Sequence, residues 1–158
     1  MNPLCEMLAA EDIELDADLD SADAVLARLA AILARRIGRL PADVLRGLEH
    51  RERLGSTALG HGVAIPHARL AECGAEAAAL VRTATPVPYG APDGRPVSLF
   101  LGLVVPAQAG EQHLKLLATA AALLGDRSKR ATLATCASAA DVVAVLETLP
   151  DAPGAPNR

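Results

Sequence analysis

The stretch VSLFLGLVVP at residues 97–106 is a nearly continuous apolar run and decides the fold of this chain. It is far shorter than the roughly 20 residues that a membrane span needs. It also lacks the apolar and polar alternation of a strand with one wet face. A short run of this kind is typical of a central strand that is covered on both faces. We therefore expect a sheet packed between layers of helices.

The segments on either side of this run predict a hairpin and two helices. The preceding PVPYGAPDGRP (86–96) is rich in turn residues, and its Asp-Gly pair suggests a hairpin. Before it, AEAAALVRT (75–83) is predicted to be a strand, although its alanines also favour a helix. After the run, GEQHLKLLATAAALLG predicts a helix over 110–125, and Ser138 can cap another over 138–149.

The N-terminal third predicts one strand followed by two helices. Residues 13–19, IELDADL, alternate apolar and acidic side chains, which is the period of a half-buried strand. Ser21 can then cap a helix whose apolar residues follow helical spacing and which ends at Gly38. Pro41 has the position of a first-turn proline, and it begins a second helix that closes near Gly55.

Strands mixed with helices around a buried strand predict an α/β protein: a single three-layer domain with a mixed β-sheet flanked by helices. The length of 158 residues fits one domain, which we place at residues 1–150, with a disordered tail at 151–158. Because the chain has one Tyr, one Phe and no Trp, its core must be aliphatic.

The composition excludes several classes of function. The formal net charge of −4 and the scarcity of aromatic side chains argue against a protein that binds nucleic acid. The basic residues are concentrated, since residues 28–69 hold eight arginines against three acids, which favours an anionic substrate or partner. Three cysteines without a C-x-x-C pattern and without a visible signal peptide suit a reducing cytoplasm. We expect no membrane insertion, no metal and no cofactor.

The unusual residues gather in LGSTALGHGVAIPHARL (54–70). Its glycines can leave backbone amides free for an anion, but the motif matches neither a nucleotide-binding P-loop nor a dinucleotide fingerprint. A single phosphoryl group suits it better, with Ser56, Thr57 and Gly62 as phosphate-binding residues. VAIPHA reads as a short strand whose Pro66 must lie at an edge or at a strand end.

His67 directly after Pro66 is the candidate nucleophile, because a neutral imidazole can accept a phosphoryl group near pH 7. The alternative is a structural or surface histidine, and the residues alone leave it open. We interpret His61 as a loop residue and His50 as an exposed helix residue. A zinc site formed by His61, His67 and His113 lacks metal-ligand spacing.

Residues 51–70, RERLGSTALGHGVAIPHARL, resemble the active-site signature of enzyme IIA of the phosphoenolpyruvate phosphotransferase system, in its fructose, mannitol and nitrogen-regulatory class. Residues 95–124, RPVSLFLGLVVPAQAGEQHLKLLATAAALL, resemble a later block of the same family, in which a buried strand leads to a helix with a second histidine. The resemblance covers about residues 5–149. Many relatives carry Gly where this chain has Ala58.

The resemblance implies a phosphotransferase that works as a phosphocarrier. His67 would accept a phosphoryl group from the phosphohistidine of HPr or an HPr-like carrier, on the ring nitrogen Nε2. Arg51 would balance the charge of the phosphate, and His113, in the first turn of its predicted helix, would form a hydrogen bond near the phosphoryl group or the incoming histidine.

Within the class, the chain looks most like the nitrogen-type regulatory enzyme IIA, whose partners include potassium transporters and sensor kinases. One alternative is a sugar-specific enzyme IIA that passes phosphate to a cysteine of enzyme IIB. Another is a non-catalytic binding domain of the same fold, and a third is a generic α/β binding module with a structural His67.

Overall fold

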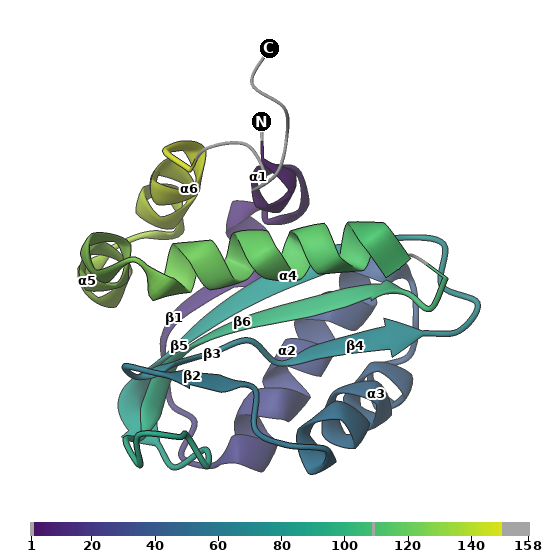
Figure 1. The fold of residues 1–158 in the computed structure, drawn as a ribbon, viewed down its shortest axis with the longest axis horizontal. Coiled ribbons are helices and arrows are strands. Elements are labelled where there is room, and N and C mark those ends of the chain that lie inside the picture. The colour runs from purple at the N-terminus through teal and green to yellow at the C-terminus, as the bar shows by residue number, and fades with distance from the viewer. Residues whose placement is uncertain (1, 109, 150–158) are drawn as a thin grey trace.

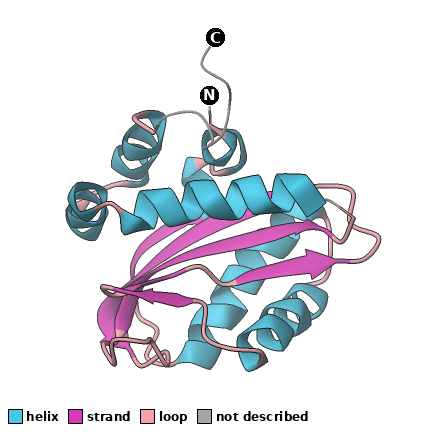
Figure 2. Cartoon of the chain, viewed as in Figure 1, coloured by secondary structure: helices cyan, strands magenta, loops and turns pink. Residues whose placement is uncertain are grey.

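The computed structural model describes residues 2–108 and 110–149, and a six-stranded mixed sheet lies between two layers of helices (Figures 1 and 2). The strands are β1 (Ile13–Ala17), β2 (Ala58–Gly60), β3 (Val63–Ala64), β4 (His67–Leu70), β5 (Ala77–Val87) and β6 (Val97–Pro106). The helices are α1 (Pro3–Met7), the 3-10 turn η1 (Ala10–Asp12), α2 (Ala22–Ile37), α3 (Pro41–Arg53), α4 (Gly110–Gly125), α5 (Arg127–Thr135) and α6 (Ala139–Glu147). This is the three-layer α/β arrangement that the sequence predicts.

Strand β6 is the central strand of the sheet, as its apolar run predicts. The strand order is β1-β5-β6-β3-β2, and β4 also pairs with β6. Phe100 and Val104 pack toward α2 and α3, whereas Leu101 and Leu103 pack toward α4, and all four side chains are buried. Alternate residues of β6 therefore face two separate cores, so both faces of the strand must be apolar.

Strand β5 settles the ambiguity between strand and helix in the alanine-rich segment. Ala77, Ala78 and Ala79 are fully buried, and β5 pairs in parallel with β1 and antiparallel with β6. Small side chains fit between two helical layers, so tertiary packing decides against the helical propensity of alanine. Strand β1 ends at Ala17, two residues earlier than predicted, and its register with β5 shifts between Glu14 and Ala17, where Asp16 adopts a positive φ of 56°.

The predicted helices are present with their caps. Ser21 accepts a hydrogen bond from the backbone N–H of Ala24 at 3.1 Å, and Gly38 ends α2 in the left-handed conformation, with φ 69°. Ser138 caps α6 in the same way. The short elements α1, η1 and β2, and also α5, are not predicted from the sequence. Helix α5 buries only Leu133, so its sequence carries little apolar periodicity.

Helices α2 and α3 cover one face of the sheet, and α1, α4, α5 and α6 cover the other (Figure 1). No helix in the described ranges is long and apolar enough to cross a bilayer. The tail predicted at 151–158 lies outside the described residues.

Candidate functional site

A break in the sheet edge places His67. Strands β3 and β4 both pair in parallel with β6, and residues Ile65 and Pro66 separate them. Pro66 has no N–H to donate, but its carbonyl accepts a hydrogen bond from the Leu103 N–H at 2.9 Å. The proline therefore sits at an edge, as predicted, and His67 is the first residue of the resumed strand.

A hydrogen bond to the backbone orients the His67 ring. Nδ1 lies 2.8 Å from the carbonyl oxygen of Ile65. A carbonyl only accepts, so Nδ1 carries the proton, and in the neutral ring the lone pair is on Nε2. The half-buried side chain thus presents Nε2 as its nucleophilic atom.

The environment of His67 favours the neutral form of the ring. Burial lowers the pKa below its ordinary value of 6.5, and the positive charges of Arg51 and Arg69 lower it further. The hydrogen bond to Ile65 and the charge of Glu52 act in the opposite direction without reversing the shift.

Close packing of α3 on β4 brings Arg51 to His67. A Cβ on Gly47 would meet Leu70 Cδ2 at 2.9 Å and Ala68 Cβ at 3.0 Å, so only glycine lets the helix approach this closely. Arg51 lies one turn further along α3 and donates from Nη1 to the Gly55 carbonyl at 2.9 Å. Arg51 and His67 line two adjoining hollows of about 480 and 240 Å³.

His113 reaches the larger hollow from the first turn of α4. Its ring lies 5.7 Å from that of His67, centroid to centroid, with a tilt of 50° between the planes. The side chain is buried, and its Nδ1 has no hydrogen-bond partner among the residues that the structure describes. Burial, together with the charge of Arg69, lowers the pKa of His113.

Arg69 is a residue of this site that the sequence analysis missed. Strand residues two positions apart point to the same face of a sheet, so Arg69 shares the face of His67. It is exposed and lines the larger hollow beside His113. The spacing of two after His67 was the signal that could have found it.

The two predicted hydroxyl donors line the smaller hollow, but both hydroxyls have protein acceptors. Ser56 Oγ donates to the Tyr89 carbonyl at 2.9 Å, and Thr57 Oγ1 donates to the Glu52 carboxylate. The Thr57 N–H donates to the same carboxylate at 3.1 Å. Their visible role is to hold the loop beside Arg51.

The structure does not bring Gly62 to His67. Gly62 lines a different hollow, and its carbonyl accepts from the Ser98 N–H at 3.0 Å. It shapes the turn between β2 and β3, where Gly60, His61 and Gly62 all have positive φ. His61 is exposed there, and its N–H donates to Asp93 at 2.8 Å.

The residues that converge are therefore His67, Arg51, His113 and Arg69. A neutral imidazole between guanidinium groups can attack an electrophilic phosphorus and then hold a small dianion. Within residues 2–108 and 110–149, no group of three or more His, Cys, Asp or Glu side chains could hold a metal ion.

This fold is that of the enzyme IIA class. The chain matches the family described as "Phosphoenolpyruvate-dependent sugar phosphotransferase system, EIIA 2" over residues 6–148, and it belongs to that family.

Within the family, the chain is similar to proteins named nitrogen regulatory protein. It is 38% identical to that of Bradyrhizobium diazoefficiens over 125 residues, which cover 79% of this chain and 82% of that protein. It is 43% identical to that of Pseudomonas aeruginosa over 101 residues, which cover 63% of this chain and 66% of that protein. The second match thus spans slightly less than two thirds of the relative.

Solved structures agree on the fold. The crystal structure of nitrogen regulatory protein IIA-Ntr from Neisseria meningitidis superposes with a TM-score of 0.87 at 40% identity, over 90% of this chain and 98% of that chain. The mannitol enzyme IIA of Escherichia coli, solved in complex with phosphorylated mannitol enzyme IIB, superposes with a TM-score of 0.74 at 21% identity, over 89% and 96%. The second likeness concerns the fold alone.

Proposed function

We propose that this protein is a phosphocarrier of the nitrogen-regulatory type, which accepts a phosphoryl group on Nε2 of His67. The donor is the phosphohistidine of HPr or of an HPr-like carrier. The observation that carries the proposal is the Nδ1 contact with the Ile65 carbonyl, because it leaves Nε2 with the lone pair. Three free cysteines favour a reducing compartment, and we place this exchange in the cytoplasm.

In the transfer step, the lone pair of Nε2 attacks phosphorus while the bond from phosphorus to the donor nitrogen breaks. The donor ring, whose second nitrogen carries a proton, keeps that electron pair and becomes a neutral imidazole. Nδ1 of His67 keeps its proton and its bond to Ile65, so the phosphorylated His67 ring takes over the positive charge that the donor ring loses and the exchange needs no separate proton acceptor. Arg51 and Arg69 offset the charge of the phosphoryl oxygens, and His113 donates an N–H to one of them.

The experiment is phosphorylation from phosphoenolpyruvate with enzyme I and HPr. We expect a mass increase of one phosphoryl group that is lost in acid, and phosphorus–nitrogen couplings in NMR spectra that assign it to Nε2 of His67. A chain that stays unmodified with HPr and with every HPr-like carrier tested would favour a non-catalytic binding domain instead.

A pH profile tests the neutral nucleophile. Because burial and Arg51 lower the pKa of His67, we expect phosphate acceptance to fall on acidification through a midpoint below pH 6.5, as Nε2 is protonated. The midpoint is best measured by NMR titration of the His67 ring in the free protein, since the donor also contains a histidine. A midpoint at or above 6.5 would contradict the proposed environment.

Arg69 offers a test of the electrostatics. Removing this positive charge in Arg69→Gln makes protonation of both rings easier, so both pKa values should rise, that of His113 more than that of His67. Phosphate acceptance should slow about fivefold, the size of an exposed charge interaction. Arg127→Gln, at the exposed start of α5, removes the same charge far from the site and serves as the control. Equal effects of the two variants would mean that only net charge matters.

The mannitol enzyme IIA, which has the same fold as this chain, was solved in complex with phosphorylated enzyme IIB. The second candidate function is therefore that of a sugar-type enzyme IIA, which passes phosphate on to a cysteine of enzyme IIB. Incubation of the phosphorylated protein with enzyme IIB modules separates the two types. Retention of the phosphate favours the nitrogen type, whose state is read by partners such as a potassium transporter or a sensor kinase.

A further inference from the structure

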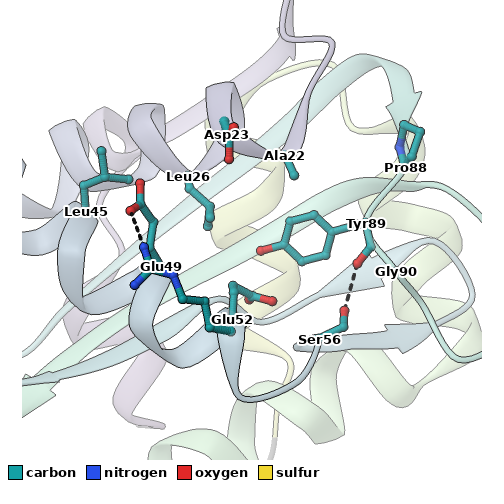
Figure 3. A pocket seen from close by; sticks show the side chains of 11 residues that line it. Ala22, Asp23, Leu26, Leu45, Glu49, Glu52, Ser56, Pro88, Tyr89 and Gly90 are labelled. Atoms are coloured by element: carbon teal, nitrogen blue, oxygen red, sulfur yellow. Dashed lines mark hydrogen bonds and ion pairs between the residues drawn. The ribbon is translucent and has the colours of Figure 1, made fainter.

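A second cleft, of about 970 Å³, lies between α2, α3 and the segment 88–90 (Figure 3). Its size is that of a small-molecule site. Leu26 and Leu45 give it an apolar wall, and three carboxylates, from Asp23, Glu49 and Glu52, face it. It shares no lining residue with the larger hollow at His67.

The phenol of Tyr89 points into this cleft toward Leu26 and Glu52 (Figure 3). Its ring packs edge-on against Phe100, with centroids 5.1 Å apart, and the side chain is 8% exposed. The hydroxyl makes no hydrogen bond of ordinary length with the residues that the structure describes, and Glu52 and Thr57 are the side chains near enough to influence it. Its oxygen lone pairs are therefore open to a donor bound in the cleft.

The charges in the cleft indicate what that group is. Arg53 is the single basic side chain in the cleft lining, and it pairs with Glu49 at 3.6 Å. Its side chain is 73% exposed, so this ion pair is weak and can open. The guanidinium of Arg53 therefore shows that the carboxylates of the cleft can pair with a cationic group.

We propose that the cleft binds a small organic cation, an alkyl amine or an alkyl guanidine. Its charged group lies between Glu49, Glu52 and the Tyr89 hydroxyl, and its alkyl part lies on Leu26 and Leu45.

Hydrogen bonds connect this cleft to His67. Glu52 accepts from the N–H and the hydroxyl of Thr57. The Thr57 carbonyl accepts from the Ile65 N–H at 3.1 Å, and the Ile65 carbonyl accepts from Nδ1 of His67. A cation that draws the Glu52 carboxylate toward the cleft loosens the first link, so the occupant changes the setting of the His67 ring.

The test is an NMR titration of the ¹⁵N-labelled protein with butylguanidinium, with butylurea as its neutral isostere. We expect saturable shifts at the amides of Glu49, Glu52 and Gly90 with butylguanidinium alone, followed by shifts at Thr57 and His67. This readout does not depend on phosphoryl transfer, so the proposed function and this inference fail separately.

Variants locate the site. Tyr89→Phe keeps the contact with Phe100 and removes only the hydroxyl, and it should weaken binding about fivefold. Glu49→Gln should weaken it about tenfold, whereas Glu147→Gln, at the end of α6, should leave it unchanged. Well-dispersed spectra of each variant establish that it folds. Shifts with butylurea as large as those with butylguanidinium would overturn the site, and so would wild-type affinity for butylguanidinium in both Tyr89→Phe and Glu49→Gln. Shifts that stop at Glu52 would overturn the connection to His67.

Discussion

Replacement of His67 by glutamine is expected to abolish phosphate acceptance, with a rate at least about 10³-fold below that of the wild type. The amide of glutamine can still donate a hydrogen bond to a backbone carbonyl, but it has no basic nitrogen with which to attack phosphorus. The half-buried ring contributes little to the core, so the free energy of unfolding should change by less than about 1 kcal/mol. Mass spectrometry after incubation with phosphorylated HPr measures the transfer, and urea denaturation measures the stability.

The matched control is His61→Asn, because His61 is exposed and has a φ of 57°, which asparagine tolerates. This variant should accept phosphate at the wild-type rate. Transfer that persists in folded His67→Gln, with the phosphate found on His113 or His50, would remove His67 from its proposed role.

The sequence predicts those elements whose pattern is local. Strand β6 can be predicted because its ten consecutive residues are buried or partly buried between two layers of helices. Helix α2 can be predicted from the helical spacing of its apolar residues and from its caps, Ser21 and Gly38. Strand β2 and helix α5 carry no such pattern. These two elements are stabilised by contacts with neighbouring elements: β2 pairs with β3, and α5 contacts α4 and α6. Such tertiary contacts cannot be predicted from the local pattern of apolar and polar residues.

The candidate site shows the same division. The resemblance placed Arg51, His67 and His113 in one site, and the structure brings them together. The resemblance does not explain how Arg51 comes close to His67. This approach depends on Gly47, whose lack of a Cβ lets α3 pack closely against β4. A sequence also does not reveal that a hydroxyl already has an acceptor within the protein, as the Thr57 hydroxyl does when it donates a hydrogen bond to the Glu52 carboxylate.

The second large effect is expected at Arg82, which fastens the helical segment α5–α6 to the sheet. Its buried guanidinium donates from Nη1 to the carbonyls of Leu133, at 3.0 Å, and Cys136, at 2.8 Å. Nη2 pairs with Asp16 at 3.1 Å, but the Asp16 side chain is 73% exposed. Exposed ion pairs contribute between about 0 and 1 kcal/mol, whereas a buried carbonyl left without a donor costs about 1–3 kcal/mol. The two carbonyls should therefore dominate.

Arg82→Met, which keeps most of the side-chain length, should lower the free energy of unfolding by about 2–3 kcal/mol, since the desolvation cost of the guanidinium is recovered and offsets part of the loss. Asp16→Asn should lower it by less than about 0.5 kcal/mol, and Arg28→Met, which breaks an exposed pair with Glu14, by a similarly small amount. Urea denaturation of the three variants separates the contributions. If Asp16→Asn proved as harmful as Arg82→Met, the ion pair and not the carbonyl bonds would hold α5–α6 to the sheet, and the ranking by burial would be wrong.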